Sequence, residues 1–234
     1  LSAAAFADAE FGMSRSIGTC NTMGTASTMG AVFEAMGLAL MGSSGIPAPD
    51  ARKKSAAQLA GRHIVDLIRR CVTFSRIATP VAFENAIRVN AALGGGTNTT
   101  VHLLALAGRL GLDITIDDIE AHSRAVPLMA NIMPNGEFLM EDFFNAGGLP
   151  ALMMAMGDLL RTDLPTVSGR TLGEDIAEAE IFDSRVITTP DAPFKTEPSL
   201  AVLKGNLAPS GAIIKATAAS PHLLRHRGPA VVFE

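Results

Sequence analysis

Cysteine is scarce in this sequence, and the two cysteines present, Cys20 and Cys71, cannot build a disulfide framework. The sequence also shows no leader-like segment, so we expect a reducing, cytoplasmic location. No apolar run is long enough to span a bilayer, because Glu34 interrupts even residues 30–42, although the mean hydropathy is +0.30. These absences exclude a disulfide-rich secreted scaffold and predict no membrane partner.

Positive charge is also in short supply. The chain has 19 Lys and Arg against 23 Asp and Glu, which gives a net charge of -4. A nucleic-acid partner is therefore not expected, since such proteins present a basic face. The one basic cluster, at 222–227, lies between Pro221 and Gly228 and is expected to be a solvated loop. With 48% hydrophobic and 18% charged residues in 234, the chain is predicted to fold around an apolar core.

The spacing of apolar residues and of helix-start signals predicts a chain of helices with brief strands between them. Helices are expected at 28–40, after Asp50, from Thr79-Pro80 to Gly94, at 99–110, after Thr115, at 141–145, 150–160 and 171–180. Short strands are expected at 128–132, 200–203, 212–215 and 230–233. The fold class is therefore predicted as α/β: a partial, helix-rich α/β/α domain at 1–190, a linker at 191–204, and the start of a β-rich, barrel-like domain at 205–234. Because the sequence starts with Leu and stops within a strand-like run, we expect a fragment.

The densest motif is the loop at 18–29, Gly-Thr-Cys-Asn-Thr-Met-Gly-Thr-Ala-Ser-Thr-Met, which leads directly into a helix. Backbone N–H groups and the positive end of a helix suit an anionic ligand and favour the thiolate form of a cysteine. Cys20 then has three interpretations: a buried small hydrophobe, a nucleophile, or a ligand of a metal or cluster. No CxxC or HxxxH pattern accompanies it, so spacing alone leaves the three open.

A second candidate site is the glycine triplet at 94–96, followed by Thr97 and Asn98. Glycines before a helix can hold a carboxylate, but they also serve as a C-cap and a tight turn, which is the commoner role. Thr97 and Asn98 are therefore only candidate substrate contacts. We expect His102 to be a hydrogen-bonded core histidine, Lys215 to point to solvent from a strand end, and Cys71 to be structural.

The loop at 18–29 resembles the segment of the dihydroxy-acid and phosphogluconate dehydratase family that contains the third cysteine ligand of the iron–sulfur cluster. Its sequence Asn-Thr-Met-Gly-Thr-Ala-Ser is similar to that of the sugar-acid branch of the family. Further matches follow in the order of the family and cover nearly the whole chain. They lie at 82–87, 93–98, 102–105, 134–136, 140–142, 147–150, 205–212 and 228–233.

The resemblance implies a hydro-lyase that converts a 2,3-dihydroxy acid, here a sugar acid, to a 2-keto acid. It implies an iron–sulfur cluster (2Fe–2S, with 4Fe–4S as the alternative) held by three cysteines, of which Cys20 is one, and Mg²⁺ in the intact enzyme. It also implies a homo-oligomer. By this resemblance no catalytic residue lies within the chain, because the base, the other two cysteines and the magnesium ligands belong to other segments.

The resemblance leads to one prediction about the chain by itself and leaves two rival functions open. One thiolate cannot hold a cluster, so we expect the 234 residues alone to bind none and to be inactive. The rivals are a branched-chain dihydroxy-acid dehydratase of amino-acid biosynthesis and a non-catalytic α/β module that binds a small anion.

Overall fold

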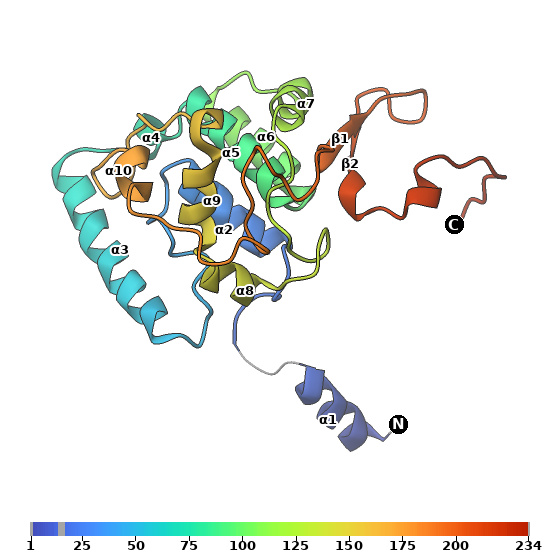
Figure 1. The fold of residues 1–234 in the computed structure, drawn as a ribbon, viewed down its shortest axis with the longest axis horizontal. Coiled ribbons are helices and arrows are strands. Elements are labelled where there is room, and N and C mark those ends of the chain that lie inside the picture. Colours follow the sequence, from blue (N-terminus) through green and yellow to red (C-terminus); the bar gives the residue numbers. More distant parts are fainter. Residues whose placement is uncertain (1, 14–16, 234) are drawn as a thin grey trace.

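The computed structural model describes residues 2–13 and 17–233, and these residues are mostly helical (Figure 1). The α-helices are α1 (Ala3–Met13), α2 (Thr25–Ala35), α3 (Ala51–Arg69), α4 (Phe74–Ile77), α5 (Pro80–Leu93), α6 (Asn98–Leu110), α7 (Ile116–Arg124), α8 (Met140–Asn145), α9 (Gly148–Met156) and α10 (Leu172–Ile176). Two strands, β1 (Leu200–Leu203) and β2 (Ala212–Lys215), form an antiparallel pair. Short 3₁₀ turns lie at Gly157–Leu159, Ala216–Ala218 and Pro221–Leu223.

Helix α5 is the centre of the molecule. Ten of its 14 residues are buried, as expected for a helix that is apolar on nearly all sides. It packs against α2 and α7 (Figure 1) and contributes to both apolar clusters of the core. One cluster, which includes Phe83 and Ile87, joins α5 to α2, α6 and α7. The other, which includes Val89 and Leu93, joins it to α8, α9, α10 and the segment around Met129.

The helix starts predicted from local signals are confirmed. Asp50 caps α3 by accepting the N–H of Arg52, and Thr79 caps α5 directly before Pro80. Thr115 and Asp118 form a reciprocal capping box at α7, which continues past Ile119 to Arg124. Gly94 ends α5 in the left-handed conformation with φ 61°.

The strand predictions are confirmed only in part. Strands at 200–203 and 212–215 are present, with Leu200 opposite Lys215, but no strand forms at 230–233. Residues 128–132 are extended yet pair only through isolated bridges, for example between Leu128 and Lys195, because their neighbours are irregular segments. The helix-rich character of the predicted fold class therefore holds. Over the described residues, β1 and β2 form the one regular sheet.

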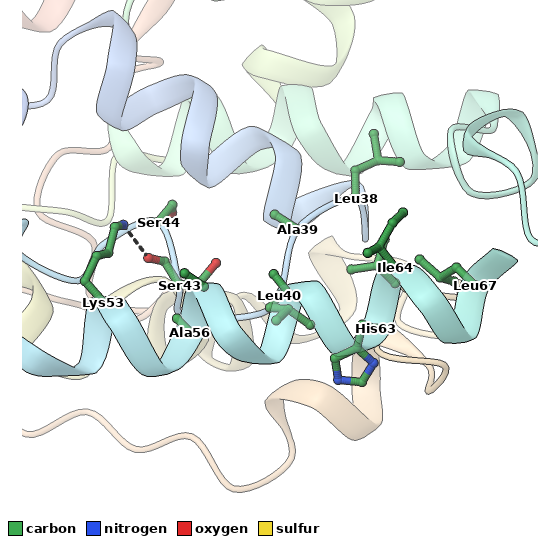
Figure 2. A pocket seen from close by; sticks show the side chains of 13 residues that line it. Leu38, Ala39, Leu40, Ser43, Ser44, Lys53, Ala56, His63, Ile64 and Leu67 are labelled. Carbon is green, nitrogen blue, oxygen red and sulfur yellow. Dashed lines mark hydrogen bonds between the residues drawn. The ribbon is translucent and has the colours of Figure 1, made fainter.

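Helix α3 lies along the edge of the molecule (Figure 1), and most of its residues are exposed. Apolar residues recur on it at helical spacing, at Ile64, Leu67 and Ile68, but of α3 only Leu67 is buried, while Ile64 and Ile68 are 54% and 69% exposed. An open groove of about 490 Å³ runs between α3 and residues 38–44 (Figure 2). In the described part of the chain, no helix is long and apolar enough to cross a membrane.

Candidate active-site cavity

The loop that carries Cys20 is anchored by hydrogen bonds of two residues that follow the cysteine, Asn21 and Met23. The N–H of Met23 donates to the carbonyl of Met133 at 2.9 Å, and the Met23 side chain is buried. Asn21 accepts two N–H groups from the first turn of α8, that of Met140 through its carbonyl (3.2 Å) and that of Glu141 through Oδ1 (3.1 Å). The first N–H groups of a helix have no partner within it, so Asn21 both caps α8 and fixes the loop.

Directly before these anchors, the Cys20 thiol is free and exposed, and it lines a cavity of about 340 Å³. The cavity, called here the Cys20 cavity, lies between the loop, the start of α2, the turn before α3 and the start of α8. Its lining residues are Ile17, Gly18, Thr19, Cys20, Asn21, Ala26, Ser27, Ser44, Gly45, Ile46, Pro47, Ala48, Pro49, Lys53, Met140 and Glu141. Hydroxyl, amide, ammonium and carboxylate groups therefore share one cavity with an accessible thiol, a lining suited to a polar ligand.

Glu34 supports one wall of this cavity from inside the protein. Its carboxylate is fully buried and accepts the N–H groups of Gly42 and Ser44, both at 2.6 Å, so it fixes the turn at 42–44. Burial raises the pKa of Glu34, against the lowering effect of the bonds from Ser44 and Gly42 and of the charge on Lys53. The sequence signal for this role is a single carboxylate within an apolar helix.

The second candidate site lies beside the first turn of α2 but outside the Cys20 cavity. The amide Nδ2 of Asn98 donates to Oγ1 of Thr25 at 2.8 Å, and the N–H of Gly96 donates to Oγ1 of Thr28 at 2.9 Å. Thr97 is half-buried at the start of α6 and Asn98 is exposed. Neither residue is among those that line the Cys20 cavity. The structure thus packs the segment at 94–98 against the C-terminal part of the loop at 18–29.

Two further expectations, those for His102 and Lys215, need correction. His102 is exposed on α6, at the rim of a shallow surface hollow, instead of being hydrogen-bonded in the core. Lys215 is half-buried, and this burial lowers the pKa of its ammonium group. Cys71 follows the end of α3 in the left-handed region, with φ 52°, and is exposed. Residues 222–227 are exposed, as expected for a solvated loop.

Comparison with known proteins relates this arrangement to one family. Residues 1–175 match the sequence profile described as "Dihydroxy-acid/6-phosphogluconate dehydratase N-terminal", and residues 185–234 match the corresponding C-terminal profile. The chain belongs to the dihydroxy-acid/6-phosphogluconate dehydratase family. The resemblance first seen in the loop at 18–29 is thereby confirmed.

Several relatives within this dehydratase family are similar along almost the whole chain. The L-arabinonate dehydratase of Rhizobium leguminosarum bv. trifolii (strain WSM2304) is 50% identical over 233 residues, which is 99% of this chain and 40% of the relative. The L-arabonate dehydratase of Azospirillum brasilense is 48% identical over 232 residues (98% and 40%). A dihydroxy-acid dehydratase of Caldicellulosiruptor saccharolyticus is 43% identical over 219 residues (93% and 40%). The chain therefore spans about 40% of the length of these relatives.

Iron and magnesium need more ligands than the described residues supply. Across residues 2–13 and 17–233, no group of three His, Cys, Asp or Glu side chains is placed to hold a metal ion. The exposed Cys20 thiol, facing a cavity, suits one ligand position of an iron–sulfur cluster. A complete cluster needs thiolates from other segments, and no acidic set suited to Mg²⁺ is present in the described part.

Proposed function

We propose that the chain is part of a hydro-lyase that dehydrates a C5 or C6 aldonic acid to its 2-keto-3-deoxy acid. We further propose that Cys20 contributes one thiolate to the iron–sulfur cluster of that enzyme. The observation that carries the proposal is the exposed thiol at the wall of a polar cavity, on the loop whose sequence is similar to the family's sugar-acid branch. The sugar-acid dehydratases that share 48–50% identity with the chain support this substrate class. A cytoplasmic location and homo-oligomeric assembly stay predictions.

The reaction removes a proton from C2 and hydroxide from C3, and the resulting enol tautomerises to the ketone with net loss of one water. When bound, the cluster supplies a Lewis-acid iron that stabilises the charge developing on the leaving C3 oxygen. The chain's own contribution is to present the Cys20 thiolate and to line the cavity with the hydroxyl-bearing residues Thr19 and Ser27 and with Asn21. Such groups both donate to and accept from the hydroxyls of a sugar acid, so they would orient it. The base that takes the C2 proton is assigned to a segment beyond this chain.

The test replaces each cysteine by serine in the full-length enzyme. Cys20→Ser should remove the visible absorbance of the cluster, lower bound iron to a small fraction of the wild-type value, and abolish dehydration of L-arabinonate. Cys71→Ser is the matched control, because Cys71 is also free and exposed but is outside the Cys20 cavity. Wild-type iron content in Cys20→Ser would overturn the assignment and favour a module that only binds a small anion.

A comparison of substrates tests the branch of the family. The wild-type enzyme should convert L-arabinonate with a kcat/KM at least tenfold above that for 2,3-dihydroxyisovalerate. The reverse order would assign the protein to branched-chain amino-acid synthesis. L-Arabinonate carries further hydroxyls beyond C3, where 2,3-dihydroxyisovalerate carries only methyl groups on C3, so the ratio shows which of the two kinds of substituent the cavity accepts.

A further inference from the structure

Lys53 is a residue of the Cys20 cavity for which the sequence gave no signal. It lies in the first turn of α3, is half-buried, and donates from Nζ to the carbonyl of Ser43 at 2.9 Å (Figure 2). Lys53 and Ser44 line both the Cys20 cavity and the neighbouring groove along α3. The hydrogen bond to Ser43 fixes the ammonium of this shared residue.

The turn at 42–44, which accepts the hydrogen bond from Lys53, is also hydrogen-bonded to Glu34. The N–H groups of Gly42 and Ser44 donate to the buried carboxylate of Glu34. The carbonyl of Ser43, which lies between them in the chain, accepts a hydrogen bond from the ammonium of Lys53. The positive charge of Lys53 lowers the pKa of Glu34, so the two groups are close enough to interact. Glu34 therefore acts as a positioning residue for Lys53, through a turn that cannot shift without losing three hydrogen bonds.

Lys53 retains hydrogen-bonding capacity for a ligand. An ammonium group has three donors, and Ser43 takes one. Among the described residues that line the cavity, Lys53 is the one cationic side chain. It forms no ion pair with Glu141, the one carboxylate in that lining, or with any other described acidic residue within 4.0 Å. Two ammonium donors and a positive charge thus remain available at a cavity whose lining otherwise combines apolar side chains, polar groups and the carboxylate of Glu141.

We propose that Lys53 binds an anionic oxygen of the polyhydroxy acid in the Cys20 cavity. The inference rests on the proposed function and adds a specific binding residue to it. An ammonium recognises an oxyanion through charge-assisted hydrogen bonds, while hydroxyls and the carboxylate of Glu141 suit the hydroxyls of the same ligand. The lining therefore selects an acid that also carries hydroxyl groups, in preference to a simple carboxylate or a neutral polyol.

The first test measures the reactivity of individual lysines in the full-length enzyme by limited acetylation and peptide mass spectrometry. Saturating L-arabinonate should slow acetylation of Lys53 at least threefold, whereas equimolar acetate or L-arabinitol should not. Lys54 is an internal control, since it is the next residue along α3, is exposed, and does not line the cavity. Equal protection by acetate, or no protection by L-arabinonate, would overturn the inference.

The second test is kinetic and separates the inference from the proposed function. Lys53→Met should raise the KM for L-arabinonate about tenfold, the loss expected for one charged hydrogen bond, with a much smaller change in kcat. Lys53→Arg should restore most of the affinity, and Lys54→Met should behave as wild type. An unchanged KM in an otherwise active Lys53→Met enzyme would refute the role of Lys53 alone. A wild-type enzyme inactive on every aldonic acid would refute the proposed function as well.

Discussion

Glu34 shows how much of the cavity depends on a residue that does not line it. A buried carboxylate is costly unless its oxygens are satisfied, and here each oxygen accepts one backbone N–H at 2.6 Å. Because the donors belong to the turn beside the Cys20 cavity, the same two bonds that satisfy the charge also shape the wall. The isolated carboxylate in an apolar run was visible in the sequence, but its partners, eight and ten residues away, were not.

Glu34→Gln should destabilise the protein by about 2 kcal/mol, because an amide presents one acceptor and turns an N–H₂ group toward a backbone donor. The change is measured as the free energy of unfolding in urea at pH 7. Glu178→Gln, at an exposed position, is the control and should change stability little. Equal stability of the two variants would mean that the turn finds other hydrogen bonds.

The same residue makes stability depend on pH. Burial raises the pKa of Glu34 above its ordinary value of 4.5, so the folded state holds this proton more tightly than the unfolded state. Its contribution to stability is complete below pH 4.5 and is lost as the pH rises through the folded-state pKa. The free energy of unfolding of the wild type should therefore decline over this range relative to that of Glu34→Gln. A parallel course for the two proteins would contradict the raised pKa.

Individual helices were more predictable than their surroundings. The starts of α3, α5 and α7 follow from side chains within one turn, Asp50, Thr79 and Thr115, so local sequence suffices. The burial of α3, the exposure of His102 and the irregular pairing of 128–132 depend on which segments pack nearby, which no local pattern encodes. For the same reason, Cys20 could be identified from its local sequence motif. The roles of Lys53 and Glu34 could not, because they depend on contacts with the turn at 42–44.

The turn between α5 and α6 packs closely against side chains of α5 and α2, and adding a single methyl group at Gly95 tests this contact. A Cβ at Gly95 would lie 2.0 Å from Oδ1 of Asn90 and 2.5 Å from Cγ2 of Thr28, both on buried side chains. Gly95→Ala should therefore destabilise the protein by about 1–3 kcal/mol, as overpacking does. Thermal or urea unfolding provides the measurement.

Gly108 supplies the matched control for this substitution. It lies within α6, and a Cβ there would meet nothing within 4 Å. Gly108→Ala should stabilise the protein by about 0.5–1 kcal/mol, because alanine gives up less conformational entropy on folding than glycine. If both substitutions changed stability in the same direction, the close packing at Gly95 would not be the cause.

For the molecule as a whole, the chain of 234 residues should not assemble a cluster by itself. The described residues provide one cavity-facing thiol and no metal-binding group of three side chains, whereas a cluster requires several thiolates. Anaerobic reconstitution with iron and sulfide, followed by visible spectroscopy and an iron assay, should yield well under one cluster per chain. The full-length enzyme treated in parallel is the control, and a stoichiometric cluster in the shorter chain would contradict the prediction.

The position of α5 has a consequence for how the protein unfolds. Since one helix supplies side chains to both apolar clusters, we expect a loss of packing in one cluster to weaken the other. The two clusters should then unfold together as one cooperative unit.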